Sequence, residues 1–270
     1  MSDERDARPA SGHENPDWPV AFRGVTESVV TTLGPNERYN VAALGIHAPS
    51  ADESCDGERG ADSDATARTW GRTRTRRNFE ARGEGYVQFV RDPVVFVDAA
   101  LTIREVEEPV LDGADAWVRV RAERIDAGQT GDTGWVDWRL VPVESEVRRR
   151  VVPAFNRGYA AVVEATVAAS RLTVGSYDTE ELRARIAYFE RVAARCGGSE
   201  ERAAFERLYD VVDERDQADD AFAERNREDD AFAERNREDD AFAERNREDD
   251  AFAERNQDDA FAERDQEDET

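Results

Sequence analysis

The sequence contains no lysine, and only two cysteines, two histidines and one methionine among its 270 residues. All 37 basic residues are therefore arginine. Cys55 and Cys196 form no Cys-x-x-Cys pair, which argues against a disulfide framework and against a zinc site. Because His13 and His47 are the only histidines, a single chain cannot build a multi-histidine metal site.

Long apolar runs and common nucleotide-binding motifs are also missing. No stretch reaches the roughly 20 apolar residues of a membrane span, and residues 1–17 are too polar and acidic for a signal peptide. We therefore expect a cytoplasmic location and no membrane partner. A Gly-x-Gly-x-x-Gly sequence between a strand and a helix is absent, which argues against a Rossmann dinucleotide domain. No side chain stands out as a general acid or base.

Negative charge is abundant but unevenly distributed. The formal net charge is −25, and most of the excess lies in residues 1–17, 50–66 and 213–270, which leaves the remainder nearly neutral. An acidic chain without lysine is typical of a salt-loving archaeon, whose dense carboxylates keep proteins hydrated; a GC-rich genome would also explain the missing lysine. Nucleic acid is a poor partner for such a chain.

Residues 18–145 carry the pattern of a small β-barrel. Two runs rich in β-branched residues, 22–33 and 39–46, surround the turn signal Gly34-Pro35-Asn36 and predict a β-hairpin. Residues 50–66 predict a low-complexity surface loop, with order resuming near Arg68. Further strands and two short helices are predicted, the strands over 86–90, 116–122 and 135–141 and the helices over 73–82 and 93–100.

Residues 146–212 change to helical periodicity. Three helices are predicted, over 156–172, 178–194 and 199–212, and the first is expected to bury Ala160, Val163, Val167 and Ser170. The fold class is therefore α+β, with a barrel followed by a small helical domain. Residues 1–17 are expected to form a disordered leader.

Residues 213–270 form an acidic tail built on a ten-residue repeat, AFAERNREDD. Successive phenylalanines at this spacing spiral around a helix instead of forming a stripe, so no continuous apolar seam results. One phenylalanine per repeat is too little apolar surface to offset the entropy of ordering. The tail is predicted to be disordered or a fraying helix; an array that binds a partner is the alternative.

Residues 68–78 form the strongest local signal, with five arginines in eleven residues and no acid from Ala67 to Phe79. If a helix begins at Thr73 or Thr75, its free backbone N–H groups lie beside the arginines and hydroxyls. Guanidinium groups, hydroxyls and a helix N-terminus together suit a phosphate group. The alternative is a solvated basic helix face, paired with acids of residues 50–66.

The predicted hairpin carries small residues, which would let a flat ring approach its backbone. Thr31, Thr32, Ala42 and Ala43 flank Asn40 on its two strands. Ordinary barrel packing is the alternative. Two weaker candidates are Asn156-Arg157, which could reach a ligand or merely start a helix, and the tryptophans, which fit core or dimer contacts better than ligand stacking: Trp70, Trp117, Trp135 and Trp138.

The order and spacing of these motifs resemble a known family. The run from Val30 to Leu44 resembles the opening hairpin of the flavin-reductase-like split barrels, and Thr75-Arg-Arg-Asn-Phe79 followed by Gly85-Tyr-Val-Gln-Phe89 resembles their next helix and strand. More closely, residues 18–212 resemble an archaeal family of unknown function that joins this split barrel to a helical C-terminal domain.

The resemblance implies a homodimer that binds flavin mononucleotide (FMN) near the subunit interface. By carry-over, the flavin ring would be lined by Thr31, Thr32, Asn40, Ala42 and Ala43. The phosphate would be held by Arg72, Thr73, Arg74, Thr75 and Asn78, and several arginines compete for that contact. An oxidoreductase of the flavin-reductase-like class with an unknown substrate is the leading hypothesis. A non-catalytic flavin-binding protein and an interaction protein that uses its tail are the alternatives.

Overall fold

The computed structural model describes residues 18–48, 65–152, 154–218 and 221. The leader at 1–17, nearly all of the loop at 50–66 and the decapeptide repeats, apart from Ala221, lie outside the described residues. Within the described ranges, no helix combines the length and the hydropathy needed to cross a bilayer.

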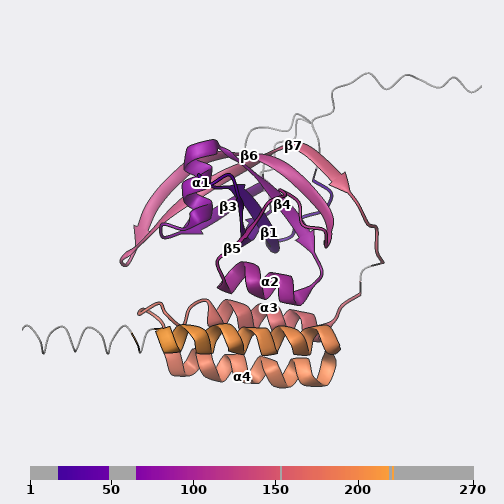
Figure 1. Ribbon diagram of the computed structural model, residues 1–270, viewed down its shortest axis with the longest axis vertical. Helices are drawn as coiled ribbons and strands as arrows, with labels where there is room; N and C mark the ends of the chain where they lie inside the picture. The colour runs from indigo at the N-terminus through magenta and orange to yellow at the C-terminus, as the bar shows by residue number, and fades with distance from the viewer. Residues whose placement is uncertain (1–17, 49–64, 153, 219–220, 222–270) are drawn as a thin grey trace, which may run out of the picture. The chain divides into compact units, whose positions relative to one another are not determined.

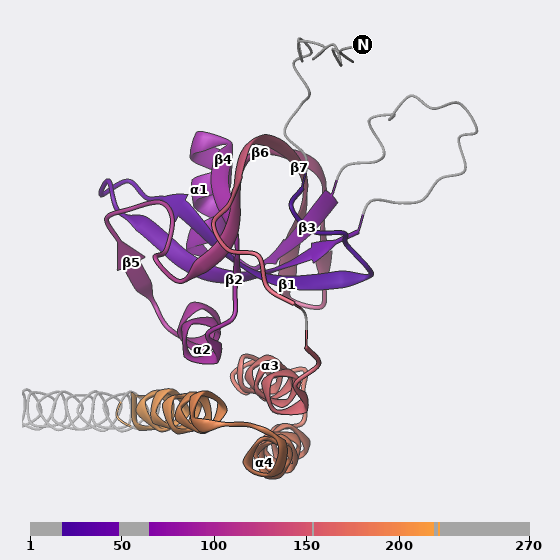
Figure 2. The same ribbon diagram turned by 90° about the vertical axis from the view of Figure 1, so that its right-hand side faces the viewer.

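Six antiparallel strands close into a barrel (Figures 1 and 2). The strand order is β1-β4-β6-β7-β3-β2-β5, and pairing between β1 and β2 closes the first six, while β5 extends from β2. Closure leaves the six barrel strands without free edges. The bounds are β1 Val25–Leu33, β2 Tyr39–His47, β3 Ala65–Trp70, β4 Glu84–Val90, β5 Arg104–Val106, β6 Ala114–Thr130 and β7 Thr133–Val147.

The structure confirms the predicted hairpin and the α+β class, and it corrects several boundaries. β3 begins at Ala65, so the last two residues of the predicted 50–66 loop belong to a strand. β7 runs to Val147, two residues past the predicted end of the barrel. β6 extends to Thr130 and turns into β7 at Gly131, whose φ of 57° favours glycine. The three-residue strand β5 was not predicted.

The barrel interior is filled by alternating β-branched residues and two aromatic rings. Val30, Val87 and Val118 have no exposed surface, and Phe79 meets Trp138 with their ring centroids 5.2 Å apart. A second cluster lies on the outer face of β1 and β2, where Val29 and Val41 pack with α2 residues. The two clusters follow from the period-2 alternation of side chains along these strands.

Two short helices connect the strands as their capping residues predict. α1 spans Arg74–Arg82, starts at the N-cap Thr73 and ends at Gly83, which has a left-handed φ of 67°. α2 spans Pro93–Leu101 and starts at Asp92, whose carboxylate accepts hydrogen bonds from the N–H groups of Val94 and Val95. The cap chemistry is local, so the sequence alone places both starts.

The C-terminal part contains α3 (Arg157–Ala169), α4 (Thr179–Cys196) and a helix over residues 199–218. The last helix passes the predicted boundary at 212. The predicted buried face of α3 was wrong, because Ala160 and Ser170 are exposed. α3 buries its small residues instead, among them Gly158, Ala161 and Ala165. A Cβ at Gly158 would lie 2.4 Å from the Cα of Gly197, so glycine permits a close backbone approach there.

Tyr159 on α3 offers a clean test of pH-dependent stability. Its hydroxyl donates a hydrogen bond to the carbonyl oxygen of Val90 at 3.4 Å, and burial, followed by the charges of Asp92 and Glu27, raises the pKa of Tyr159 above 10.0. A raised phenol pKa stabilises the folded state below the unfolded pKa, and that contribution is lost as pH rises through the folded pKa. Because the chain has no lysine, few other groups titrate in that window.

We expect Tyr159→Phe to lower the melting temperature at about pH 8, where one hydrogen bond of about 1 kcal/mol is lost. The deficit should shrink as pH rises toward about 11, because only the native protein then carries a buried phenol that resists ionisation. Thermal unfolding followed by circular dichroism across that range measures it. A deficit that stays constant with pH would contradict the expectation.

Candidate functional site

The turn before α1 is fixed by contacts that leave the helix start open. Gly71 has a φ of 64°, its N–H donates to the carbonyl of Gly134 at 2.7 Å, and its own carbonyl accepts from Arg76 Nη1 at 3.0 Å. Thr73 Oγ1 accepts from the N–H of Arg76 at 3.2 Å. The N–H groups of the first helical residues, Arg74 and Thr75, have no intrahelical acceptor, so they suit an anion.

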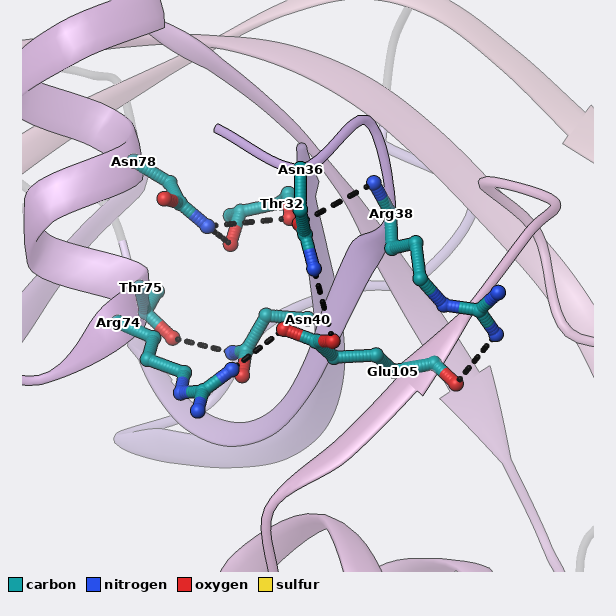
Figure 3. Close-up of polar contacts among 8 residues, drawn as sticks. All are labelled: Thr32, Asn36, Arg38, Asn40, Arg74, Thr75, Asn78 and Glu105. Carbon is teal, nitrogen blue, oxygen red and sulfur yellow. Dashed lines mark hydrogen bonds and ion pairs between the residues drawn. The ribbon is translucent and has the colours of Figure 1, made fainter. Parts of the chain in front are cut away.

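Two buried polar contacts attach α1 to the β1–β2 hairpin (Figure 3). The Asn78 amide donates to the carbonyl and hydroxyl oxygens of Thr32 at 3.2 and 3.0 Å. Asn40 Nδ2 lies 3.5 Å from Thr75 Oγ1, a longer contact. Thr75 and Asn78 are only 4% and 6% exposed, so their side chains face the hairpin and not the surface. Their main effect is to set where the helix begins relative to the hairpin.

The five arginines of residues 68–78 divide into paired and unpaired groups. Arg68 forms a two-pronged ion pair with Asp137 and lies over the ring of Trp135, 4.0 Å from its centroid. Arg74 pairs with Glu105 of β5, and Arg76 pairs with Glu80 at 3.0 Å. The other two, Arg72 and Arg77, are exposed and have no hydrogen-bond or ion-pair partner among the described residues.

The segment is therefore only partly the solvated basic face that the sequence allowed. The acids that pair with it come from α1, β5 and β7, whereas residues 50–64 lie outside the described chain. Two uncompensated guanidinium groups and two free N–H donors at one helix start leave the local positive charge available to a ligand.

The hairpin residues predicted to line the flavin ring divide between two faces. Thr32, Asn40 and Ala42 lie on the face toward the barrel interior and α1. Ala43 packs in the outer cluster with β1 and α2. The buried Thr31 hydroxyl is held on that outer face, where it accepts from Gln88 Nε2 at 3.0 Å and donates to the Pro109 carbonyl. The structure therefore brings three of the five together with α1.

Three residues near this site gave no sequence signal. Glu105 accepts from Arg74 and, at 3.0 Å, from the Asn36 amide, and its carbonyl accepts from Arg38 at 3.5 Å (Figure 3). Gln88 has no exposed surface and joins three elements. Glu105 lies on a three-residue strand without periodicity, and a single glutamine inside an apolar strand reads as noise.

The two weaker candidates fit structural roles. Asn156 caps α3 by accepting from the N–H groups of Gly158 and Tyr159 at 2.7 and 3.4 Å, which is the plain helix start. Trp138 is buried in the barrel core, and Trp117 donates to Glu146 at 2.8 Å. Trp70 is 46% exposed, so a contact with a partner subunit stays a prediction.

The site suits a phosphate-bearing ligand with a flat ring. The open start of α1 supplies N–H donors, the Thr73 hydroxyl and unpaired guanidinium groups. The adjacent hairpin offers the small residue Ala42 and the backbone of β1 and β2. FMN combines both chemical parts, and the residues present fit it.

A closed six-stranded barrel with α1 attached to its first hairpin, followed by helices, defines an α+β protein of the flavin-reductase-like split-barrel class. Family comparison then gives the particular family. The N-terminal domain of a protein of unknown function, DUF447, matches residues 26–149, and the second DUF447 model matches residues 156–210. The chain belongs to the DUF447 family, which confirms the predicted family architecture; an origin in a salt-loving archaeon stays a prediction.

Solved structures agree with this fold. An FMN-bound protein from Methanosarcina mazei, also assigned to DUF447, is 26% identical, with a TM-score of 0.57 over 71% of this chain and 96% of that chain. An FMN-binding protein from Thermus thermophilus with bound 1-cyclohex-2-enone is 17% identical, with a TM-score of 0.33 over 55% and 81%. The flavin reductase HpaC complexed with NADP+ is 14% identical, with a TM-score of 0.30 over 47% and 81%.

Proposed function

We propose that the protein is an FMN-binding flavoprotein of the flavin-reductase-like oxidoreductase class. The observation that carries the proposal is the open, positively charged start of α1, held by buried polar contacts against the β1–β2 hairpin. The FMN-bound member of the same family supports the choice of FMN among phosphate-bearing ligands.

The residues divide into those that would contact FMN and those that would position the contacts. Arg72, Thr73 and the N–H groups of Arg74 and Thr75 would hold the phosphate. Asn78 would act through Thr32 by fixing the helix start. When bound, FMN would supply the redox chemistry, and the protein would bind and orient it. This division fits a site in which the sequence shows no general acid or base.

The first test is direct binding of FMN. Protein purified in molar KCl should absorb near about 450 nm or bind added FMN with quenching of flavin fluorescence. Riboflavin, which lacks the phosphate, should bind much more weakly. A protein that binds neither, or that binds riboflavin as tightly as FMN, would overturn the proposed phosphate site.

Arg72→Ala should weaken FMN binding about tenfold or more, because a charge-assisted hydrogen bond contributes about 1.5–3 kcal/mol. Riboflavin affinity should change little, since the removed charge faces the phosphate. Arg202→Ala, at an exposed position of the last helix, is the matched control and should bind FMN like the native protein. An equal loss for both flavins would place Arg72 elsewhere than at the phosphate.

Catalysis requires a separate measurement. Oxidation of NADH or NADPH by the FMN-loaded protein, compared with free FMN at the same concentration, distinguishes a reductase from a carrier or sensor. A rate above that of free flavin supports the oxidoreductase. A rate equal to that of free flavin, together with tight binding, supports the non-catalytic alternative.

The proposed functional unit is a homodimer. Support comes from exposed apolar side chains in the segment that follows β7, where Val152 and Phe155 are 92% and 104% exposed. Exposed residues of this kind are common at subunit contacts. Light scattering coupled to size exclusion in high salt measures the mass, and the 30.3 kDa of one chain would identify a monomer and contradict the proposal.

A further inference from the structure

A cavity of about 450 Å³ lies beside the candidate site, between β5, the start of α2 and the loop over residues 107–113. Its volume is within the usual range for small-molecule sites, about 300–1,000 Å³. Much of its lining is apolar, and is formed by Val90, Val95, Val106, Val110 and Leu111. A ligand of this cavity would bury a mainly apolar body.

One guanidinium group in this apolar lining is uncompensated. Arg104 is half-buried on β5, lines the cavity, and has no side-chain hydrogen bond or ion pair with any described residue. The other lining arginine, Arg38, is held by Glu107 at 3.2 Å. A partly buried, unpaired charge is unfavourable unless a ligand compensates it, so Arg104 is the natural partner for an anion.

The carboxylates of the lining limit which anion can enter. Asp92 caps α2, and Glu105 and Glu107 already pair with Arg74 and Arg38. Glu108 and Asp112 are exposed, where solvent and salt screen them. This acidic surrounding tolerates one negative charge at Arg104 but disfavours a second, which argues for a monocarboxylate over a phosphate.

The cavity wall is pre-formed by a buried amide. Gln88 Nε2 donates to the Pro109 carbonyl at 3.0 Å, and Gln88 Oε1 accepts from the N–H of Leu111 at 2.7 Å. Gln88 therefore fixes the loop that carries Val110 and Leu111 against the barrel. A fixed wall lowers the entropic cost of binding.

The cavity and the candidate flavin site share a wall. Glu105 lines the cavity and pairs with Arg74 at the first position of α1 (Figure 3). Arg38 lines the cavity and contacts the carbonyl of the same Glu105. A molecule in the cavity would therefore lie next to the residues that position the phosphate-binding helix.

We infer that this cavity binds a small, mainly apolar monocarboxylate through Arg104. That the cavity binds such a ligand stands on its own lining; that the ligand is the partner of a neighbouring flavin rests on the proposed function.

The test uses 2-naphthoate as the probe, with 2-naphthamide as its neutral isostere and 2-naphthyl phosphate as the dianion. Isothermal titration on the full chain, with and without added FMN, should show binding of 2-naphthoate at least tenfold tighter than of either comparison compound. Arg104→Gln should remove that preference, while Arg124→Gln, exposed on β6, should retain it. Equal binding of naphthoate and naphthamide, or an unchanged preference in Arg104→Gln, would overturn the inference.

The two proposals can fail separately. Naphthoate binding that depends on Arg104 in a protein that does not bind FMN would support the cavity and reject the flavoprotein. FMN binding in a protein that ignores naphthoate would reject the cavity alone. If both hold, saturating 2-naphthoate should perturb the flavin absorbance spectrum in the native protein and not in Arg104→Gln.

Discussion

Gln88→Leu is expected to destabilise the protein by about 3 kcal/mol or more, one of the largest effects of a single change. The side chain is fully buried, and its amide satisfies the Thr31 hydroxyl, the Pro109 carbonyl and the Leu111 N–H. Leucine has a similar volume but leaves these groups short of partners, and each unsatisfied buried group costs about 1–3 kcal/mol. For a domain of this size the melting temperature should fall by about 10 °C.

Chemical and thermal unfolding followed by circular dichroism measure this loss. Gln129→Leu is the control, because it makes the same chemical change at an exposed position near the end of β6 and should alter stability by no more than about 0.5 kcal/mol. The variant should also lose affinity for 2-naphthoate, since the loop over residues 107–113 is no longer fixed. A Gln88→Leu protein as stable as the control would show that the buried amide is dispensable.

The elements that the sequence placed well are those defined by local chemistry. α1 and α2 begin at Thr73 and Asp92, whose side chains cap their own first turns. The β1–β2 hairpin follows from two β-branched runs around the turn at 34–36. In each case the stabilising contact lies within a few residues, so the pattern is visible before the fold is known.

The elements that were missed depend on distant partners. The polar second half of β6 shows no apolar alternation, because both of its faces are largely exposed and its backbone pairing with β7 holds it. On α3, the larger Val163 and Val167 looked like the buried face. Small residues occupy that face instead, because they permit close packing of the helix, as Gly158 shows against Gly197.

The candidate site follows the same division. The motif residues Thr75 and Asn78 and the hairpin residues Thr32 and Asn40 were predicted as one site, and the structure brings these four together. Their contacts are mutual, which assigns the buried pair on α1 to positioning. The ion pair of Arg74 with Glu105 joins residues 31 positions apart, and no local pattern reveals such a contact.

Asn78→Asp is expected to abolish FMN binding and to destabilise the protein in a pH-dependent way. The substitution is nearly isosteric, but it replaces the amide that donates to Thr32 with a carboxylate facing the same carbonyl oxygen. A buried, unpaired carboxylate is costly and its pKa rises. It would also place a negative charge one helical turn from the proposed phosphate site, so FMN affinity should fall about 100-fold or more.

The sign of the pH effect distinguishes this from simple loss of packing. Because the pKa of the introduced Asp would be raised in the folded state above about 3.9, the variant should approach native stability at low pH and lose stability as pH rises through the folded pKa. Gln129→Glu, an amide-to-carboxylate change at the exposed end of β6, should show neither effect. Melting temperatures of both variants between about pH 4 and 8, with FMN titrations where each is folded, make the comparison. A pH-independent deficit with native FMN affinity would mean that Asn78 positions nothing at the start of α1.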